Sequence, residues 1–145
     1  MLKGTAKKKN HMSAEKNLDK LLESLSPLLH EGEYVFCQID SPQTTDLGHV
    51  LMLFREAESV TLVVRKEFAD QAGWTYPFVA SWITLEVYSS LDAVGLTAAV
   101  SGALAEASIS CNVVAAYNHD HLFINNKDAG LAMEVLRNLS VAKRS

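Results

Sequence analysis

The segment Asp92-Ala-Val-Gly-Leu96 has the residue types that could hold a small anionic group. Asp92 can cap a helix, because its side chain accepts hydrogen bonds from the free amides of the first turn. Gly95 has no Cβ, so a ligand or another backbone can approach it closely. An Ala-rich helical pattern follows, and a helix start presents unpaired N–H groups and the positive end of its dipole. A carboxylate suits that environment, and ordinary helix capping is the alternative role.

A second polar cluster, His119-Asp-His121, has residue types that bind metals. On a strand the two histidines would point to one side and Asp120 to the other, which leaves too few ligands for a structural zinc site. Asparagine and aspartate also tolerate the left-handed backbone of hairpin turns, so Asn118 to Asp120 fits a hairpin. The third alternative is a polar lining for a ligand pocket. We expect no metal here.

The remaining polar residues do not assemble a catalytic group. Ser89 and Ser90 lack the Gly-x-Ser-x-Gly setting of a hydrolase nucleophile. The sequence has no glycine-rich phosphate loop. His30 and His49 lie near expected turns and are predicted to be surface residues. We therefore expect a protein that is not an enzyme and needs no cofactor.

Hydrophobic periodicity indicates the elements that carry these residues. Trp82 to Tyr88 alternates as a strand does, with Ile83, Leu85 and Val87 on one face. Apolar residues at helical spacing predict a helix from residue 96 and another over residues 132–139. A strand pair around residues 118–120 separates the two helices. This order is most of a ferredoxin-like βαββαβ module.

The first half of the chain reads as a degenerate relative of the second. A leucine-rich helix is predicted to end at Pro27, and Gly73 is predicted to end a short helix. Strands are expected at 34–39, 50–54 and 60–64, the last two as a hairpin with both faces largely covered. Few residues follow Leu139, so another strand must complete the second sheet. Tyr34 to Ile39 is the leading candidate, and pairing between two chains is the alternative.

Three longer strings resemble the ACT domain, a small module that binds amino acids to regulate metabolic proteins. They are Met52-Leu-Phe-Arg-Glu56, Ser89-Ser-Leu-Asp-Ala-Val-Gly-Leu-Thr-Ala-Ala-Val100 and Ile109-Ser-Cys-Asn-Val-Val-Ala-Ala-Tyr-Asn-His-Asp-His-Leu-Phe123. Together they are similar to an uncharacterised bacterial family of short tandem ACT-like proteins, related to the ACT repeats of the cytosolic arginine sensors of animals. The resemblance spans roughly Leu18 to Leu139. It departs from the family at Val94, where the common loop has a proline, and at Ile124-Asn-Asn126, where the family has a valine-proline.

The resemblance implies an α+β protein made of two fused ACT-like halves, each ferredoxin-like. The βαββαβ order would form an antiparallel sheet with helices on one face. Residues 12–80 would be a degenerate N-terminal half, and residues 81–140 the C-terminal ACT domain. Residues 1–11 are expected to be a tag or disordered tail, because His11-Met12 resembles a cloning scar, and residues 141–145 a second tail.

The resemblance also implies an amino acid or a related small molecule as the ligand. The loop amides would hold its α-carboxylate, the start of the next strand its amino and carboxyl groups, and the hairpin its side chain. The residues so implied are Asp92, Ala93, Val94, Gly95, Leu96, Asn112, Val113, His119 and Asp120. Such a sensor would act through an unidentified protein partner, and a homodimer fits the habit of ACT modules.

The competing hypothesis is an interaction or oligomerisation module that binds no ligand. An exposed aromatic patch would favour it, because contiguous exposed apolar area often marks partner contacts. Such a patch could form around Trp74, Tyr76, Phe78 and Trp82, although core packing of the linker between the halves explains these aromatic residues equally well.

Composition favours a cytoplasmic protein that contacts neither membranes nor nucleic acid. Of the 145 residues, 48% are hydrophobic, yet no run approaches the roughly 18 apolar residues of a membrane span. Cys37 and Cys111 alone support no disulfide framework, which indicates a reducing compartment. The first eleven residues hold four of the 13 basic residues and none of the 17 acidic ones. The remainder is therefore acidic and repels phosphate backbones.

Overall fold

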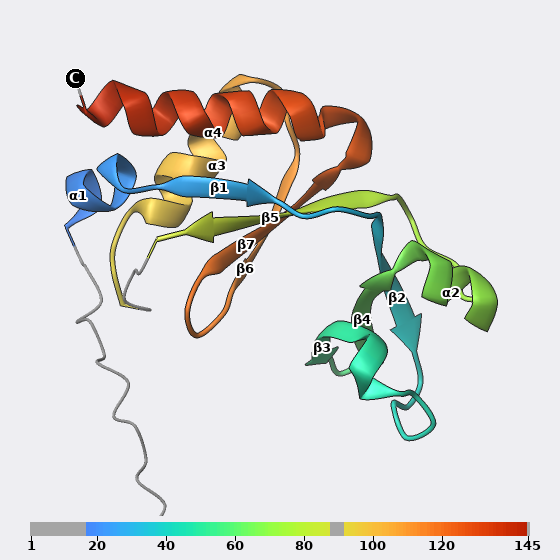
Figure 1. The fold of residues 1–145 in the computed structure, drawn as a ribbon. Coiled ribbons are helices and arrows are strands. Elements are labelled where there is room, and N and C mark those ends of the chain that lie inside the picture. Colours follow the sequence, from blue (N-terminus) through green and yellow to red (C-terminus); the bar gives the residue numbers. More distant parts are fainter. Residues whose placement is uncertain (1–16, 88–91, 145) are drawn as a thin grey trace, which may run out of the picture.

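The computed structural model describes residues 17–87 and 92–144, which form two lobes joined by long strands (Figure 1). The predicted tail of residues 1–11 lies outside the described residues. In chain order the elements are α1 (Leu18–Glu23), β1 (Ser26–Leu29), β2 (Tyr34–Ile39), the 3-10 helix η1 (Leu47–His49), β3 (Val50–Arg55), β4 (Val60–Arg65), α2 (Lys66–Ala72), β5 (Ala80–Glu86), α3 (Leu96–Glu106), β6 (Cys111–Ala115), β7 (Asp120–Asn125), the 3-10 helix η2 (Asn126–Asp128) and α4 (Ala129–Arg144). None of the described helices is long and apolar enough to cross a membrane.

The larger lobe has the predicted ferredoxin-like sheet, with strand order β1-β5-β7-β6 and every neighbouring pair antiparallel. Its helices α1, α3 and α4 cover one face of this sheet (Figure 1). The α+β class and the antiparallel sheet with helices on one face are therefore confirmed.

The strand that completes this sheet comes from the same chain, as expected, but it is β1 and not β2. Ser26 pairs with Glu86 and Leu29 with Ile83, whereas β2 meets β5 only where Tyr34 lies opposite Ala80. The leading candidate was therefore wrong. The prediction that the first helix ends at Pro27 is wrong, because that helix already ends at Glu23 and Pro27 lies in β1. A proline is tolerated in β1 because an edge strand has one row of N–H groups without a ladder partner.

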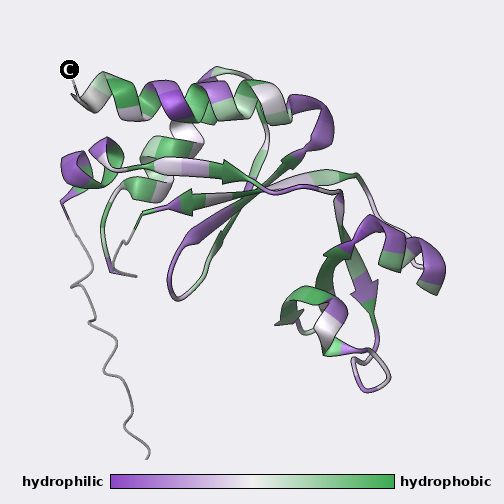
Figure 2. Ribbon diagram, viewed as in Figure 1, coloured by the Kyte–Doolittle hydropathy of each residue, from purple (hydrophilic) through white to green (hydrophobic). Residues whose placement is uncertain are grey.

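The core of the larger lobe lies between the sheet and its helices. Ile83 and Leu85 of β5 are buried there with Leu104 of α3 and Leu136 of α4. This confirms the period-two face predicted for β5 and the apolar stripes predicted for the two helices. Figure 2 shows apolar and polar positions alternating along α4. α4 continues to Arg144, through most of the segment expected to be a tail.

The smaller lobe is a three-stranded sheet with β4 in the middle and α2 packed on β2 and β4. Val35, Leu62 and Val64 form its core. The prediction that both strands of the β3–β4 hairpin are covered holds for β4 but is wrong for β3. Leu51 and Phe54 are exposed because β3 is the outer strand and α2 does not extend over it.

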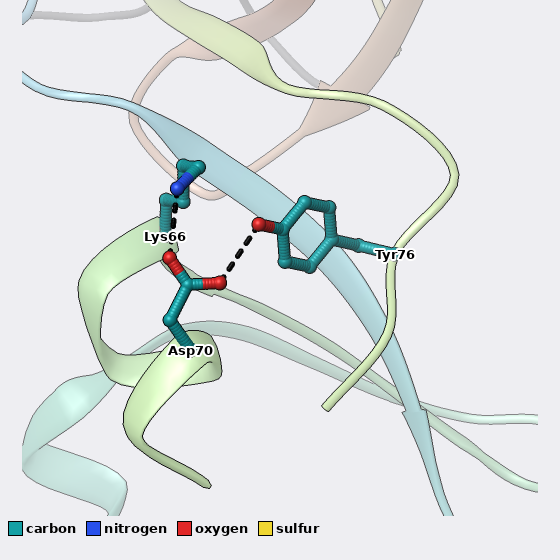
Figure 3. Close-up of polar contacts among 3 residues, drawn as sticks. All are labelled: Lys66, Asp70 and Tyr76. Carbon is teal, nitrogen blue, oxygen red and sulfur yellow. Dashed lines mark hydrogen bonds and ion pairs between the residues drawn. The ribbon is translucent and has the colours of Figure 1, made fainter. Parts of the chain in front are cut away.

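A polar cluster ties α2 to the segment that leads into β5. Asp70 accepts a hydrogen bond from Lys66 Nζ at 2.7 Å and another from the Tyr76 hydroxyl at 2.8 Å (Figure 3). The hydrogen bond from Lys66 is the largest cause of a lowered pKa of the Asp70 carboxyl, and the hydrogen bond from Tyr76 lowers it further. The helix itself ends at Gly73, whose φ of 73° is left-handed, as glycine permits.

Candidate functional site

The loop before α3 is built differently from the capped helix start that the sequence predicted. The residue that precedes the helix is Gly95, with a φ of 104°, and as a glycine it has no side chain with which to cap the first turn. Asp92 is three residues further back, in an exposed turn. Its predicted role as N-cap is therefore wrong, because the chain reaches the helix through a backbone conformation that favours glycine.

The space beside Gly95 is occupied by a side chain from α1. A Cβ on Gly95 would lie 3.0 Å from Leu18 Cδ2. Leu96 is buried in the core, and Ala93 packs against it. Val94 is 84% exposed, and Asp92 is also exposed. The accessible part of the described loop is therefore Asp92 to Val94, while Gly95 and Leu96 anchor it to the core.

The start of β7 lies beside the end of β5, where this loop begins. Asp120 pairs with Leu85 on one side and with Ala115 on the other. His119 Nδ1 is 3.4 Å from the carbonyl oxygen of Val87. Burial raises the pKa of the Asp120 carboxyl, and the charge of His119 opposes that shift. The structure thus brings His119 and Asp120 to the end of the sheet that carries the loop.

Asn112 and Val113 are not brought to this end within one chain. Asn112 pairs with Phe123, which pairs with Trp82, three residues before Leu85. At about 3.4 Å per residue this is about 10 Å back along the sheet. Asn112 also donates to the Phe123 carbonyl at 3.3 Å. Val113 points to the opposite face and packs against the core under the helices.

A hydrogen-bonded network that the sequence did not predict lies on the sheet face opposite the helices. His30 Nε2 is 2.6 Å from Thr84 Oγ1, and Thr84 Oγ1 is 3.0 Å from His121 Nδ1. Trp82 donates its indole N–H to the same nitrogen at 3.0 Å. The His30 ring stacks on Trp82, with centroids 3.5 Å apart. Burial lowers the pKa of both histidines.

The network changes two of the predictions made from sequence. His30 is half-buried, so its placement as a surface residue was wrong; the reason is that β1 carries it onto β5. His119 precedes β7, which begins at Asp120, so the two histidines do not lie on one strand, and His121 Nδ1 already has a donor in Trp82. Among the described residues no group of three or more histidines, cysteines, aspartates and glutamates could hold a metal ion. The alternation of Trp82 and Thr84 on β5 was the only signal of the network in the sequence.

The four aromatic residues of the linker are packed and do not form an exposed patch. Trp74 and Tyr76 pack against the core of the smaller lobe, and Phe78 and Trp82 pack against a cluster between the lobes. Of the two alternatives that the sequence left open for them, the structure therefore has core packing.

A cavity of about 380 Å³ opens where β2 leaves β5. Tyr34 and Trp82 line it from the centre of the sheet, and Arg65, Glu67 and Phe68 line it from the smaller lobe. No residue of the predicted loop site takes part in it.

Two models of the ACT domain match the sequence, over residues 13–81 and residues 78–138. The chain belongs to the ACT domain family. VC0802 from Vibrio cholerae, whose crystal structure is known, is 44% identical in sequence to this ACT protein. It is a protein of unknown function described as a possible transport protein. The likeness covers 85% of this chain and 95% of that one, with a TM-score of 0.77.

More distant ACT relatives share the fold. Atu0741 from Agrobacterium tumefaciens is 19% identical over 80% of this chain and 89% of its own, with a TM-score of 0.66. The regulatory subunit of aspartate kinase from Thermus flavus is 12% identical over 78% of this chain and 95% of its own, with a TM-score of 0.59. No curated protein matches the sequence. ACT domains are regulatory modules that generally bind amino acids, and the predicted membership of a tandem ACT protein is confirmed.

Proposed function

We propose that this ACT protein is a non-enzymatic regulator that binds an amino acid or a similar small metabolite. The ligand binds between the accessible loop, Asp92 to Val94, and the start of β7. The observation that supports the proposal is that the start of β7 pairs with the end of β5, the strand that leads into the loop before α3. Three features would then contribute to the site. These are the exposed part of the loop, the start of α3 and the half-buried pair His119 and Asp120.

The charges at this end suit a zwitterion. The start of α3 is the positive end of an eleven-residue helix and favours the α-carboxylate. Asp120, at the start of β7 opposite the end of β5, is a half-buried acidic group that would pair with the ammonium group. Burial raises the pKa of Asp120, and a bound cation would lower it again. Binding would therefore release protons in the pH range in which Asp120 is partly protonated.

The position of Leu18 limits where the ligand lies. Leu18 of α1 fills the space beside Gly95, so the group that approaches this glycine closely is a side chain of the protein and not the ligand. The ligand therefore lies on the Asp92 to Val94 side, and Gly95 supports the site by letting the chain turn into α3. Asn112 and Val113 of the same chain do not reach this place, so a role for them requires a second copy.

A thermal-shift screen against the amino acids, followed by calorimetry with the best ligand, tests this proposal. A ligand at a hundredfold excess over its Kd raises the free energy of unfolding by about 2.7 kcal/mol. Asp120→Asn should weaken binding by about tenfold or more, because the ammonium group loses its ionic partner. Tyr117→Ala is the matched control, since Tyr117 lies in the same hairpin and is 81% exposed. Unchanged affinity in Asp120→Asn would move the site elsewhere.

A specific observation also favours the second candidate function, an interaction or oligomerisation module. Leu51 and Phe54 of β3 and Leu47 of η1 are exposed, and β3 is the outer strand of the smaller lobe. Edge strands with exposed apolar side chains pair readily with another chain. Sedimentation of the wild type and of Phe54→Ser tests this candidate: the variant should shift toward monomer. A wild type that stays monomeric at high concentration contradicts it.

A further inference from the structure

The cavity between the lobes has the size and the walls of a ligand site, and the proposed function does not use it. Its volume of about 380 Å³ falls within the roughly 300–1,000 Å³ of small-molecule sites. It exists because β2 pairs with β5 at a single position, Tyr34 opposite Ala80, and then diverges into the smaller lobe. The cavity therefore follows from the way the two halves are joined.

Arg65, the last residue of β4, supplies a positioned positive charge at this cavity. Its guanidinium lies over the Tyr34 ring, 5.4 Å from the centroid. It also lies against Gly32, where a Cβ would be 2.6 Å from Arg65 Nη1. The left-handed φ of 98° at Gly32 and its missing side chain let the guanidinium lie there. Tyr34 is itself fixed, because its hydroxyl donates to the Glu31 carbonyl at 3.0 Å.

This charge has no acidic partner within the part of the chain that the structure describes. The carboxylate of Asp70 accepts hydrogen bonds from Lys66 and Tyr76 instead (Figure 3). Glu67 lines the cavity but forms no ion pair with Arg65. Arg65 is exposed, and an arginine side chain carries a positive charge on a planar guanidinium. A guanidinium held in place in this way is suited to bind a carboxylate with two parallel hydrogen bonds.

Aromatic side chains form part of the remaining lining, beside Val50, Leu51 and Gln71, and are held by their own contacts. Trp82 meets Tyr34 edge to face at 5.5 Å, and its other face stacks on His30. Phe68 stacks on His49 at 4.6 Å and meets Trp74 edge to face. Flat apolar groups pack well against such rings. The single fixed cation together with the negative charge of Glu67 disfavours ligands with several negative charges, such as phosphates.

We propose that the cavity between the two lobes is a second ligand site, which binds a small monocarboxylate with a flat apolar body. Arg65 binds the carboxylate, and Trp82, Tyr34 and Phe68 contact the body. The site is separate from the loop at the start of α3. The ligand touches both ACT halves, so its binding stabilises their relative arrangement.

Calorimetric titration with benzoate tests this proposal, with benzamide as the uncharged probe of the same shape. Benzoate should bind the wild type about tenfold or more tightly than benzamide, because only benzoate forms charge-assisted hydrogen bonds with Arg65. Arg65→Gln should remove that difference. Arg55→Gln is the matched control, since Arg55 is an exposed arginine of β3 outside the cavity, and it should bind benzoate as the wild type does. Circular dichroism establishes that each variant is folded.

The outcomes separate this proposal from the loop site. Asp120→Asn should leave benzoate binding unchanged, and Arg65→Gln should leave amino-acid binding at the loop unchanged. The proposal is overturned if benzoate does not bind, if benzamide binds equally well, or if folded Arg65→Gln binds benzoate like the wild type. An equal loss in Arg55→Gln also overturns it, because the effect would then reflect net charge. In each of these cases the result for the loop site stands independently.

Discussion

Two glycines next to or within α3 should respond to the same substitution with opposite signs. Gly95 precedes the helix with a φ of 104°, and a Cβ there would meet Leu18 Cδ2 at 3.0 Å. Gly102 lies inside the helix, and a Cβ there would meet nothing within 4 Å. Alanine at the two positions therefore separates backbone strain and crowding from ordinary helix propensity.

The structure sets the size of both effects. An L residue in a left-handed conformation costs about 1–2 kcal/mol. Moving Leu18 away from a 3.0 Å contact requires an off-rotamer side chain, which costs about 0.5–1.5 kcal/mol. The reduced freedom of the unfolded chain returns up to about 1 kcal/mol. Gly95→Ala should therefore lower the free energy of unfolding by about 2 kcal/mol, whereas Gly102→Ala should raise it by about 1 kcal/mol.

Urea unfolding followed by circular dichroism measures both values, and a double-mutant cycle with Leu18→Ala assigns the steric part. The part of the Gly95→Ala effect that comes from crowding should be absent when Leu18 is already alanine, so the two substitutions should not be additive. A neutral or stabilising Gly95→Ala would refute the reasoning, because it would mean that neither the backbone nor Leu18 constrains this position.

Two further predictions concern the sheet network and the core. Burial lowers the pKa of His121, so the folded state favours the neutral ring. In the unfolded chain the ring binds a proton below about pH 6.5. The folded state therefore loses stability as the pH falls through that value. Urea unfolding at about pH 7.5 and about pH 5.5 should show a smaller loss of stability in His121→Asn than in the wild type. An equal loss in His121→Asn would contradict the assignment. Leu104→Ala should cost about 3 kcal/mol of stability, since Leu104 is fully buried. Leu131→Ala on exposed α4 surface should cost less than about 0.5 kcal/mol by the same measurement, and similar costs for the two leucines would contradict the described core.

Local periodicity was sufficient to predict the larger lobe except for its edge strand β1. Alternation along β5 gave the face that carries Ile83 and Leu85, and the spacing of Leu96, Val100 and Leu104 gave the buried stripe of α3. These patterns are reliable because each depends only on the repeat of a strand or a helix. The order of these elements was then sufficient to predict the ferredoxin-like sheet.

The candidate loop site was only partly predictable. The composition of Asp92 to Leu96 indicated a loop leading into a helix, and that is what the structure has. The identity of the capping residue depended on the φ of Gly95, and the occupant of the space beside it depended on the packing of Leu18 from α1. Neither is a local property of those five residues.

The amino-acid sequence by itself determined the periods of the strands and helices, the acidic character of the chain and its family, because these are written in residue types and short spacings. Tertiary structure alone decided that β1 completes the sheet, that His30 reaches Thr84 across 54 residues, and that Arg65 faces a cavity between the lobes. The physical reason is that strand pairing and cavity walls join segments distant in sequence, and many such pairings are compatible with the same local patterns.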